Sequence, residues 1–271
     1  MMSLSRNIMF LAAVMLLISS CATLSGNGVG RVRRYVVESD RVPPSFDGLS
    51  VAFLSDLHYP SRFTHKRLRK VVACLRREAP DILLFGGDYA PSGKSARDLF
   101  SSFSSLNVTH GKYAVLGNHD YRLRDTLALV MEDAGVRLLA DDVAPVACGG
   151  DTLLLVGVGN PFSPSQALLD TVSSLPSSVY TITIAHTPDF AQSSGVQCDL
   201  VLSGHTHGGQ VSLLGLYTPV KNTKYGKRFL RGLNKTDKGV PVITTTGIGT
   251  SRRNVRFCVP SEIVILILKR R

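Results

Sequence analysis

The chain has 271 residues, of which 44% are hydrophobic and 19% charged. This length and composition support a packed core of one large or two small domains and exclude disorder as the main state. Lysine and arginine outnumber aspartate and glutamate by 31 to 20, which gives a formal net charge of +11. The charge favours an anionic partner, such as a phosphorylated substrate, a nucleic acid or an acidic membrane surface. Uninterrupted apolar runs are too short for a polytopic membrane protein.

Residues 1–21 are typical of a signal peptide with a lipobox or of a membrane anchor. Arg6 precedes a short apolar stretch over residues 8–18, whose length suits a signal peptide better than a membrane span. Small residues before Cys21 resemble a bacterial lipobox, which predicts a lipidated cysteine and a lipoprotein on the periplasmic side of the envelope. The arginines within residues 31–34 favour the alternative, an uncleaved inner-membrane anchor with its body facing the cytoplasm. In both cases we expect the body to lie beside a bilayer.

Residues 22–45 are expected to be a linker and domain entry before a single domain over residues 46–271, because glycines and a Pro-Pro pair interrupt this stretch. Regular folding should begin somewhere within residues 32–49. Short apolar runs then alternate with helical patterns. Strands are predicted at residues 49–55, 81–85, 112–116, 136–139, 152–158, 180–185, 199–202, 240–246 and 263–268, and helices at 64–78, with Thr64 as N-cap, and 125–134. This pattern predicts an α/β protein with two mixed sheets packed together and helices outside, although a single parallel sheet fits the pattern as well.

Potential metal ligands follow five of these strands. The blocks are Asp56-Leu57-His58, Gly86-Gly87-Asp88, Gly117-Asn118-His119-Asp120, His186, and Gly204-His205-Thr206-His207. Because sites in α/β proteins form at the carboxyl ends of strands, we expect these blocks to converge. Carboxylate, imidazole and amide ligands without thiolate favour Mn, Fe, Zn or Mg. The number of ligands exceeds the need of one ion, which predicts two divalent ions bridged by a carboxylate that activate water as hydroxide for attack on phosphorus.

The order DLH, GGD, GNHD, single His and GHTH resembles the calcineurin-like metallophosphoesterase superfamily through residues 51–268. The resemblance implies a four-layer αββα sandwich and a metal-dependent phosphohydrolase, with manganese favoured. It assigns Asp56, His58 and His207 to the first ion, Asn118, His186 and His205 to the second, and Asp88 to both. His119 would stay unligated beside the scissile phosphate, and Asp120 would orient it by accepting its other ring proton.

Basic residues crowd two later segments. Arg228 and Arg231 are predicted substrate contacts in the first, and Arg252, Arg253 and Arg256 form the second. Arginines beside the site would bind phosphate oxygens, whereas a solvated basic face is the ordinary alternative. Nucleic-acid binding is not expected, because the chain has no tryptophan and no interleaved aromatic stripe.

The N-terminal segment, the basic surface and the GHTHGGQ block are similar to the membrane-associated YkuE/YaeI-like branch of the superfamily, which includes the chlamydial-type UDP-2,3-diacylglucosamine pyrophosphatase. This resemblance implies hydrolysis of a glycolipid pyrophosphate in lipid A synthesis. An exported lipoprotein would instead act as a phosphodiesterase on envelope phosphodiesters or phospholipid headgroups. The third hypothesis is a lipid-tethered binding protein without activity, for which degenerate ligands would be the usual sign.

Overall fold

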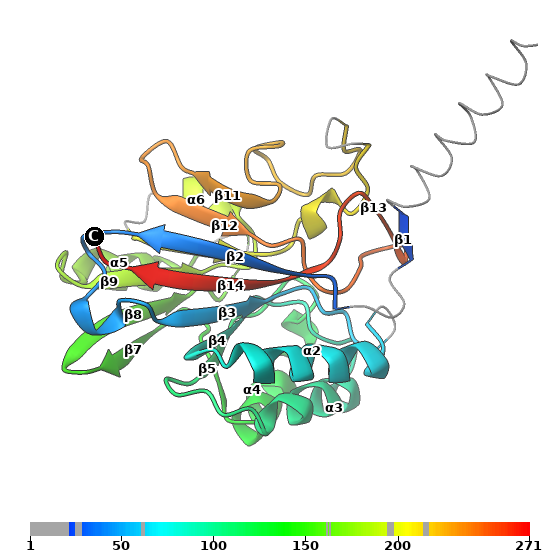
Figure 1. Ribbon diagram of the computed structural model, residues 1–271, viewed down its shortest axis with the longest axis horizontal. Coiled ribbons are helices and arrows are strands. Elements are labelled where there is room, and N and C mark those ends of the chain that lie inside the picture. Colours follow the sequence, from blue (N-terminus) through cyan, green and yellow to red (C-terminus); the bar gives the residue numbers. More distant parts are fainter. Residues whose placement is uncertain are drawn as a thin grey trace, which may run out of the picture.

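The computed structural model describes residues 22–24, 29–60, 63–160, 162, 164–193, 198–213 and 217–271. The predicted signal or anchor segment, including the predicted lipidation site Cys21, lies outside these residues. The described residues form two six-stranded mixed sheets with helices, as Figure 1 shows. The predicted α/β fold with two mixed sheets is therefore confirmed. Among the described residues, no helix is both long and apolar enough to cross a bilayer.

The first sheet has the strand order β2-β14-β3-β4-β5-β6. Its strands are β2 (Arg31–Glu38), β3 (Ser50–Leu54), β4 (Ile82–Phe85), β5 (Lys112–Ala114), β6 (Val136–Leu138) and β14 (Glu262–Lys269). Strands β3 to β6 run parallel, and β14 runs antiparallel to β3. Because β3, β4 and β5 point the same way, the loops that follow them emerge at one edge of the sheet.

The second sheet has the strand order β11-β12-β10-β9-β8-β7. Its strands are β7 (Asp142–Cys148), β8 (Asp151–Gly157), β9 (Tyr180–Ile184), β10 (Leu200–Ser203), β11 (Gly232–Lys235) and β12 (Pro241–Thr244). Strands β8, β9, β10 and β12 are parallel. Outside both sheets, β1 (Ala22–Leu24) pairs antiparallel with β13 (Val255–Phe257).

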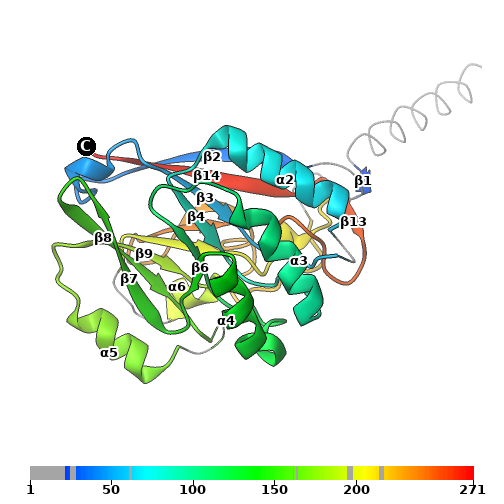
Figure 2. The same ribbon diagram turned by 90° about the horizontal axis from the view of Figure 1, so that it is seen from below.

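Hydrophobic clusters lie between the four layers, one under the helices of the first sheet, one between the sheets and two on the outer face of the second sheet. In β3, Val51 and Phe53 point into the core between the sheets, whereas Ala52 and Leu54 point into the core under the helices. The helices of the first layer are α2 (His65–Glu78), α3 (Gly93–Ser104) and α4 (Arg124–Asp133), and they cover the first sheet (Figure 2). The fourth layer contains α5 (Gln166–Ser174) and α6 (Asp189–Ser193), which pack against the second sheet.

Thr64 caps α2 as predicted, since its side chain accepts a hydrogen bond from the Arg67 backbone N–H. Residues 31–38, in the stretch expected to be linker and domain entry, form edge strand β2, which pairs with β14 along its whole length. Helix α3 was not expected at all, although Ser92 caps it and its buried residues recur at helical spacing.

Candidate metal centre

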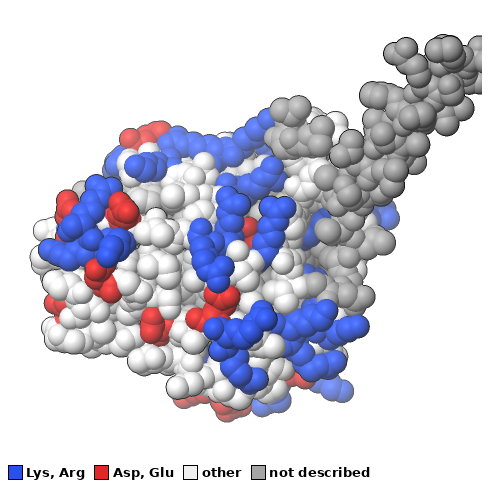
Figure 3. Space-filling model, in the orientation of Figure 1, with Lys and Arg blue, Asp and Glu red and all other residues white. Residues whose placement is uncertain are grey.

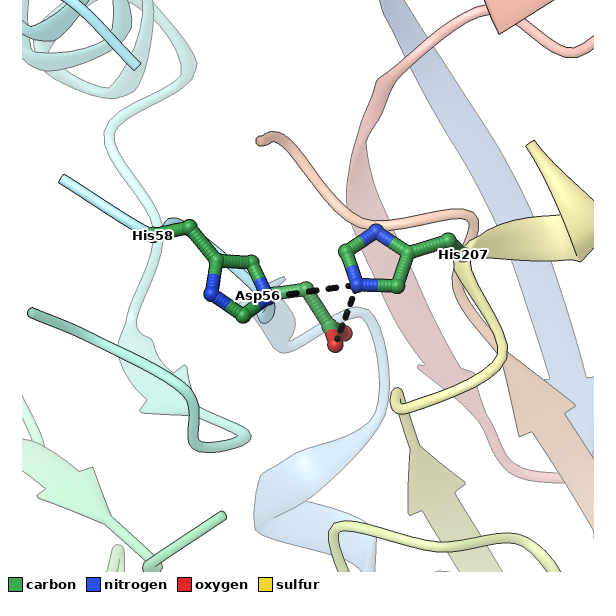
Figure 4. Close-up of side chains that lie close together, drawn as sticks. All are labelled: Asp56, His58 and His207. Carbon is green, nitrogen blue, oxygen red and sulfur yellow. Dashed lines mark hydrogen bonds and ion pairs between the residues drawn. The ribbon is translucent and has the colours of Figure 1, made fainter. Parts of the chain in front are cut away.

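The loops after β3, β4, β5, β9 and β10 meet at the edge where these strands end. His207 Nε2 lies 3.3 Å from an Asp56 carboxylate oxygen and 3.2 Å from His58 Nε2, as Figure 4 shows. Asp88 Oδ2 lies 3.6 Å from His58 Nε2 and 3.5 Å from His186 Nε2. Loops far apart in the sequence are therefore brought together, as their positions after parallel strands predicted.

Two groups of side chains have the arrangement of a metal site. Asp56, His58 and His207 form one group, and Asp56, Asp88 and His186 form the other, with the ligand atoms of each group within 4.8 Å of one another. Asp88 contacts His58 on one side and His186 on the other. Asp56 is the carboxylate that both groups contain, and Asp88 lies within reach of a histidine of each group, so the bridging role of Asp88 stays a prediction.

The remaining predicted ligands lie beside these groups. The His205 ring centroid is 5.1 Å from that of His186, and the His205 backbone N–H donates to Asp56. Asn118 follows Gly117 in the loop whose His119 backbone N–H donates to Asp88 Oδ1 at 2.9 Å. The seven predicted ligands thus come from loops that contact one another.

Buried ligand atoms without partners fit a bound cation. Among the described residues, Asn118 Oδ1 and His186 Nε2 are buried side-chain atoms that have no hydrogen-bond partner. His186 Nδ1 bonds the Gly86 carbonyl oxygen at 2.6 Å, which fixes the ring and turns Nε2 toward Asp88. Metal-binding histidines are commonly held in this way by a backbone carbonyl on the other ring nitrogen.

The charges of the site also favour a cation. Burial opposes ionisation of both Asp88 and His186, but their mutual attraction outweighs it, lowering the pKa of Asp88 and raising the pKa of His186 to about 10. Burial lowers the pKa of His207 to about 3, so this ring is neutral and its nitrogens can bind metal. Buried Asp56 and Asp88 attract positive charge, and a divalent ion bound beside them would displace the proton that His186 otherwise holds.

Much of the centre is built on unusual backbone conformations. Asp56, His58, Asp88, His205 and His207 all have positive φ, between 47° and 67°. Non-glycine residues seldom adopt this left-handed region, and they do so at functional sites where the surrounding fold holds them. The same conformation occurs elsewhere, as at Ala79, which ends α2, but five of the described residues that adopt it are predicted ligands.

Two glycines give the carboxylates the space they occupy. A Cβ atom at Gly117 would lie 2.2 Å from Asp88 Oδ1, and a Cβ at Gly204 would lie 2.4 Å from Asp56 Oδ2. Any side chain at either position would displace a carboxylate of the centre. The glycines of the GNHD and GHTH blocks are thus explained by the close approach of ligands.

His119 lies at the mouth of the centre. Its side chain is 62% exposed, and its Nε2 is 4.0 Å from Asp88 Oδ2. Its ring packs edge-on against His58, with centroids 5.3 Å apart. The ring is thus beside the centre yet accessible to a substrate, and its role in proton transfer stays a prediction.

Asp120 does not have the predicted role. Its carboxylate is fully buried and accepts hydrogen bonds from the backbone N–H groups of Asp88, Tyr89 and Gly117, at 2.7 to 3.0 Å. Burial, followed by repulsion from Asp88, raises its pKa to about 7. The side chain therefore ties the GGD loop to the GNHD loop rather than orienting the His119 ring.

Neither predicted arginine faces the centre. Arg228 donates to Asp237 and to the Lys235 carbonyl, and Arg231 donates to the Gly208 carbonyl at 3.3 Å. Arg252, from the second basic segment, instead lines a cavity of about 260 Å³ together with His58, Asp88 and His119. Both segments are rich in basic residues, so the sequence alone does not show which of them reaches the metal centre. The course of each loop in the fold decides it.

Arg256 is a structural residue of the same segment. It is fully buried, and it donates to the carbonyl oxygens of Thr246, Gly247 and Gly249 at 2.6 to 3.2 Å. It also donates to the His207 carbonyl at 3.3 Å. Burial lowers its pKa to about 10. This guanidinium holds the GHTH loop against residues 246–249 and cannot reach a substrate.

Comparisons with known proteins agree with this geometry. A family model described as Calcineurin-like phosphoesterase matches residues 49–209. The chain is 28% identical to the uncharacterized metallophosphoesterase YkuE of Bacillus subtilis, with 96% of both chains covered. It is 32% identical to the phosphodiesterase YaeI of Escherichia coli, covering 80% of this chain and 81% of YaeI.

A solved structure shows the same fold. The phosphopantetheinyl hydrolase of Mycobacterium tuberculosis superposes with a TM-score of 0.50 at 12% identity, covering 78% of this chain and 96% of that chain. At this identity the likeness concerns the fold alone. Together with the family match and the relatives, it establishes that the chain belongs to the calcineurin-like phosphoesterases and is a metal-dependent phosphohydrolase of the branch that contains YkuE and YaeI.

Proposed function

We propose that this enzyme works at a membrane surface and hydrolyses the pyrophosphate bond of a glycolipid of the UDP-2,3-diacylglucosamine type, as a step of lipid A synthesis. The observation that carries the proposal is a broad basic surface on the domain that contains the metal centre. Figure 3 shows lysine and arginine gathered over α2 and β2. The substrate presents two anionic phosphates on a lipid, which such a surface would attract.

The basic surface is formed by exposed side chains of two neighbouring elements. They are Arg31, Arg33 and Arg34 of β2, and Lys66, Arg69, Lys70, Arg76 and Arg77 of α2. Each cation near an anionic bilayer contributes about 1 kcal/mol of attraction. Arg67, in the same helix, is buried and donates to the Ile248 carbonyl, so it does not take part.

The predicted ligands would hold two divalent ions, which when bound supply Lewis acidity at phosphorus and an activated water. The water oxygen forms a new bond to phosphorus while the bond to the leaving oxygen breaks. His119 would hold a proton on its ring and give it to that oxygen. Arg252 would bind a non-bridging phosphate oxygen through its guanidinium.

The alternative is an exported lipoprotein that cleaves envelope phosphodiesters or phospholipid headgroups. The lipobox-like residues before Cys21 favour it, and a relative carries the name phosphodiesterase. A nucleotide-linked glycolipid would not reach an enzyme displayed outside the cytoplasm. The side of the membrane on which the body lies therefore selects the substrate.

The test is hydrolysis by the purified full chain with Mn²⁺, followed by ³¹P NMR. We expect UDP-2,3-diacylglucosamine to give UMP and the lipid phosphate, and ¹⁸O from labelled water to enter the product whose phosphorus is attacked. Asp88→Asn is the control for contaminating activity. Cleavage of a phospholipid but not of the nucleotide lipid would replace the first proposal by the alternative. Palmitate labelling of the wild-type chain but not of Cys21→Ser would place the body outside the cytoplasm.

A further inference from the structure

An apolar pocket of about 190 Å³ lies beside the metal centre. Three loops line it, from residues 206–211, 219–222 and 251–255. Its apolar walls are Val211, Pro219, Val220 and Val255. A cavity of roughly 150 Å³ with apolar walls is large enough for a benzene ring, so this pocket can hold a short hydrocarbon segment.

The pocket adjoins the candidate catalytic cavity. His207, a predicted metal ligand, lines the pocket. Ser251 and Arg252 line both the pocket and the cavity that contains His58 and Asp88. A molecule whose phosphate lies at the metal centre can therefore extend past Arg252 into apolar surroundings.

The boundary between the two spaces is held in place by Gln210. Its side-chain amide donates to the Arg253 carbonyl at 2.7 Å and accepts from the Ser251 backbone N–H at 2.8 Å. The Gln210 carbonyl accepts from the Phe257 N–H at 3.0 Å. The loop that carries Arg252 is thus fixed to the GHTH loop, and a pocket formed in advance binds with a smaller ordering cost.

Exposed apolar side chains surround the opening. Val211, Val220 and Val255 are 36%, 38% and 41% exposed, and nearby Leu213 and Tyr217 are 55% and 64% exposed. A local concentration of exposed apolar groups marks a binding surface more often than scattered ones do. Val255 also belongs to β13, the strand with which β1 pairs.

We infer that this pocket binds the hydrocarbon chain next to the scissile phosphate, with Arg252 at the junction between the phosphate and the chain. The substrate class is then a phosphate ester of an amphiphilic alcohol rather than a free nucleotide or a sugar phosphate. The inference rests on the proposed function in one respect, which is that the metal centre binds a phosphate group.

The test uses methyl, butyl and hexyl esters of 4-nitrophenyl phosphate with the full chain and Mn²⁺. These diesters share one leaving group and stay monomeric in water, so they differ only in the length of the chain offered to the pocket. Each methylene that enters the pocket should raise kcat/KM roughly threefold. We expect the hexyl ester to exceed the methyl ester by at least about twentyfold.

Two variants remove apolar surface from opposite sides of the pocket. Val220→Ser and Val255→Ser should each lower the hexyl-to-methyl ratio at least about threefold. Val36→Ser is the matched control, because Val36 is 55% exposed on β2 and lies outside the pocket. Its ratio should equal that of the wild type.

Calorimetric titration of hexyl phosphate and methyl phosphate gives a second readout that does not need turnover. Tighter binding of hexyl phosphate, weakened by Val220→Ser, would support the inference. Hydrolysis of the three diesters at equal rates, with equal affinities for the two phosphates, would overturn it while leaving the phosphoesterase function intact. A third outcome would be that Val220→Ser no longer binds anionic phosphatidylglycerol vesicles while kcat/KM is the same for all three diesters. This result would assign the surface to bilayer binding and would also overturn the inference. Failure to hydrolyse any diester or bind either phosphate would refute both proposals.

Discussion

The metal centre and the substrate rim differ in the backbone structure that supports them. The ligands follow strands that are buried along their length, such as β4 and β10, and come from both sheets. The described rim consists of residues 208–213, 217–222 and 251–254, where short bridges and side-chain bonds replace regular strands. Strand ends fix metal ligands with little freedom, whereas loops can vary without loss of the core. The reaction class is therefore set by the framework and the substrate by the rim.

Two arginines of one segment show this difference over a short stretch. Arg252 is exposed and lines the catalytic cavity. Arg256 is buried and binds backbone carbonyls of the loops that carry the centre. Changes in the framework should therefore abolish metal binding or folding, and changes in the rim should alter only how a substrate binds.

The largest effect is expected for Asp88→Asn. This change keeps the shape of the side chain but removes the negative charge between the two ligand groups. Turnover should fall at least about 10³-fold, because both ions lose a shared carboxylate. Bound manganese, measured by mass spectrometry, should fall below two ions per chain, whereas Arg252→Met should keep the wild-type content. Full turnover in Asp88→Asn would show that the centre is elsewhere.

Arg256→Met should cost the most stability. The change removes the donor from the buried Thr246 and Gly249 carbonyl oxygens, whereas the Gly247 carbonyl keeps the Glu262 N–H, and each unsatisfied group costs about 1–3 kcal/mol. We expect the free energy of unfolding to fall by about 3–5 kcal/mol in urea titrations. Arg253→Met, at an exposed position three residues earlier, should change it by less than about 0.5 kcal/mol. Equal stability of the two variants would contradict a structural role for Arg256.

The convergence of the ligand loops could be predicted because each ligand block directly follows a short apolar strand. Parallel strands bring such blocks together whatever their separation along the chain. Strand β2 was missed for a physical reason, since its sequence RVRRYVVE belongs to an edge strand with most side chains exposed. Such a strand has no need for the apolar pattern that identifies buried strands.

Other features depend on contacts that no local pattern contains. Arg252, Arg253 and Arg256 are equivalent in the sequence, and only the fold buries one of them among carbonyl groups. Asp120 was assigned to His119 from the resemblance alone, yet its oxygens face backbone N–H groups of two loops. By contrast, α3 had a readable signal in the Ser92 cap and the spacing of its apolar residues, which its serine content obscured.

His119→Ala should reduce turnover without removing metal. The exposed ring lies beside Asp88, where it can give a proton to the leaving oxygen. For an ester with an alkyl leaving group, kcat should fall about a hundredfold, because a poor leaving group needs the proton. For bis-4-nitrophenyl phosphate the loss should be several times smaller, since 4-nitrophenolate departs without protonation. An equal loss for both esters, at unchanged manganese content, would rule out proton donation by this residue.

The smallest effect is expected for arginines at the rim, where KM should distinguish Arg252 from Arg228. Arg252→Met should raise KM for a phosphodiester about tenfold, because an exposed charge-assisted hydrogen bond is weakened by solvent. Arg228→Met should leave KM unchanged, since that guanidinium is bonded to Asp237 and the Lys235 carbonyl. The wild-type KM should also rise with salt and approach that of Arg252→Met, because ions screen a contact at the rim more than one in the buried centre. An equal rise in KM for Arg228→Met and Arg252→Met would place the substrate on the Arg228 side of the rim. It would also contradict the proposal that the substrate extends from the metal centre into the apolar pocket.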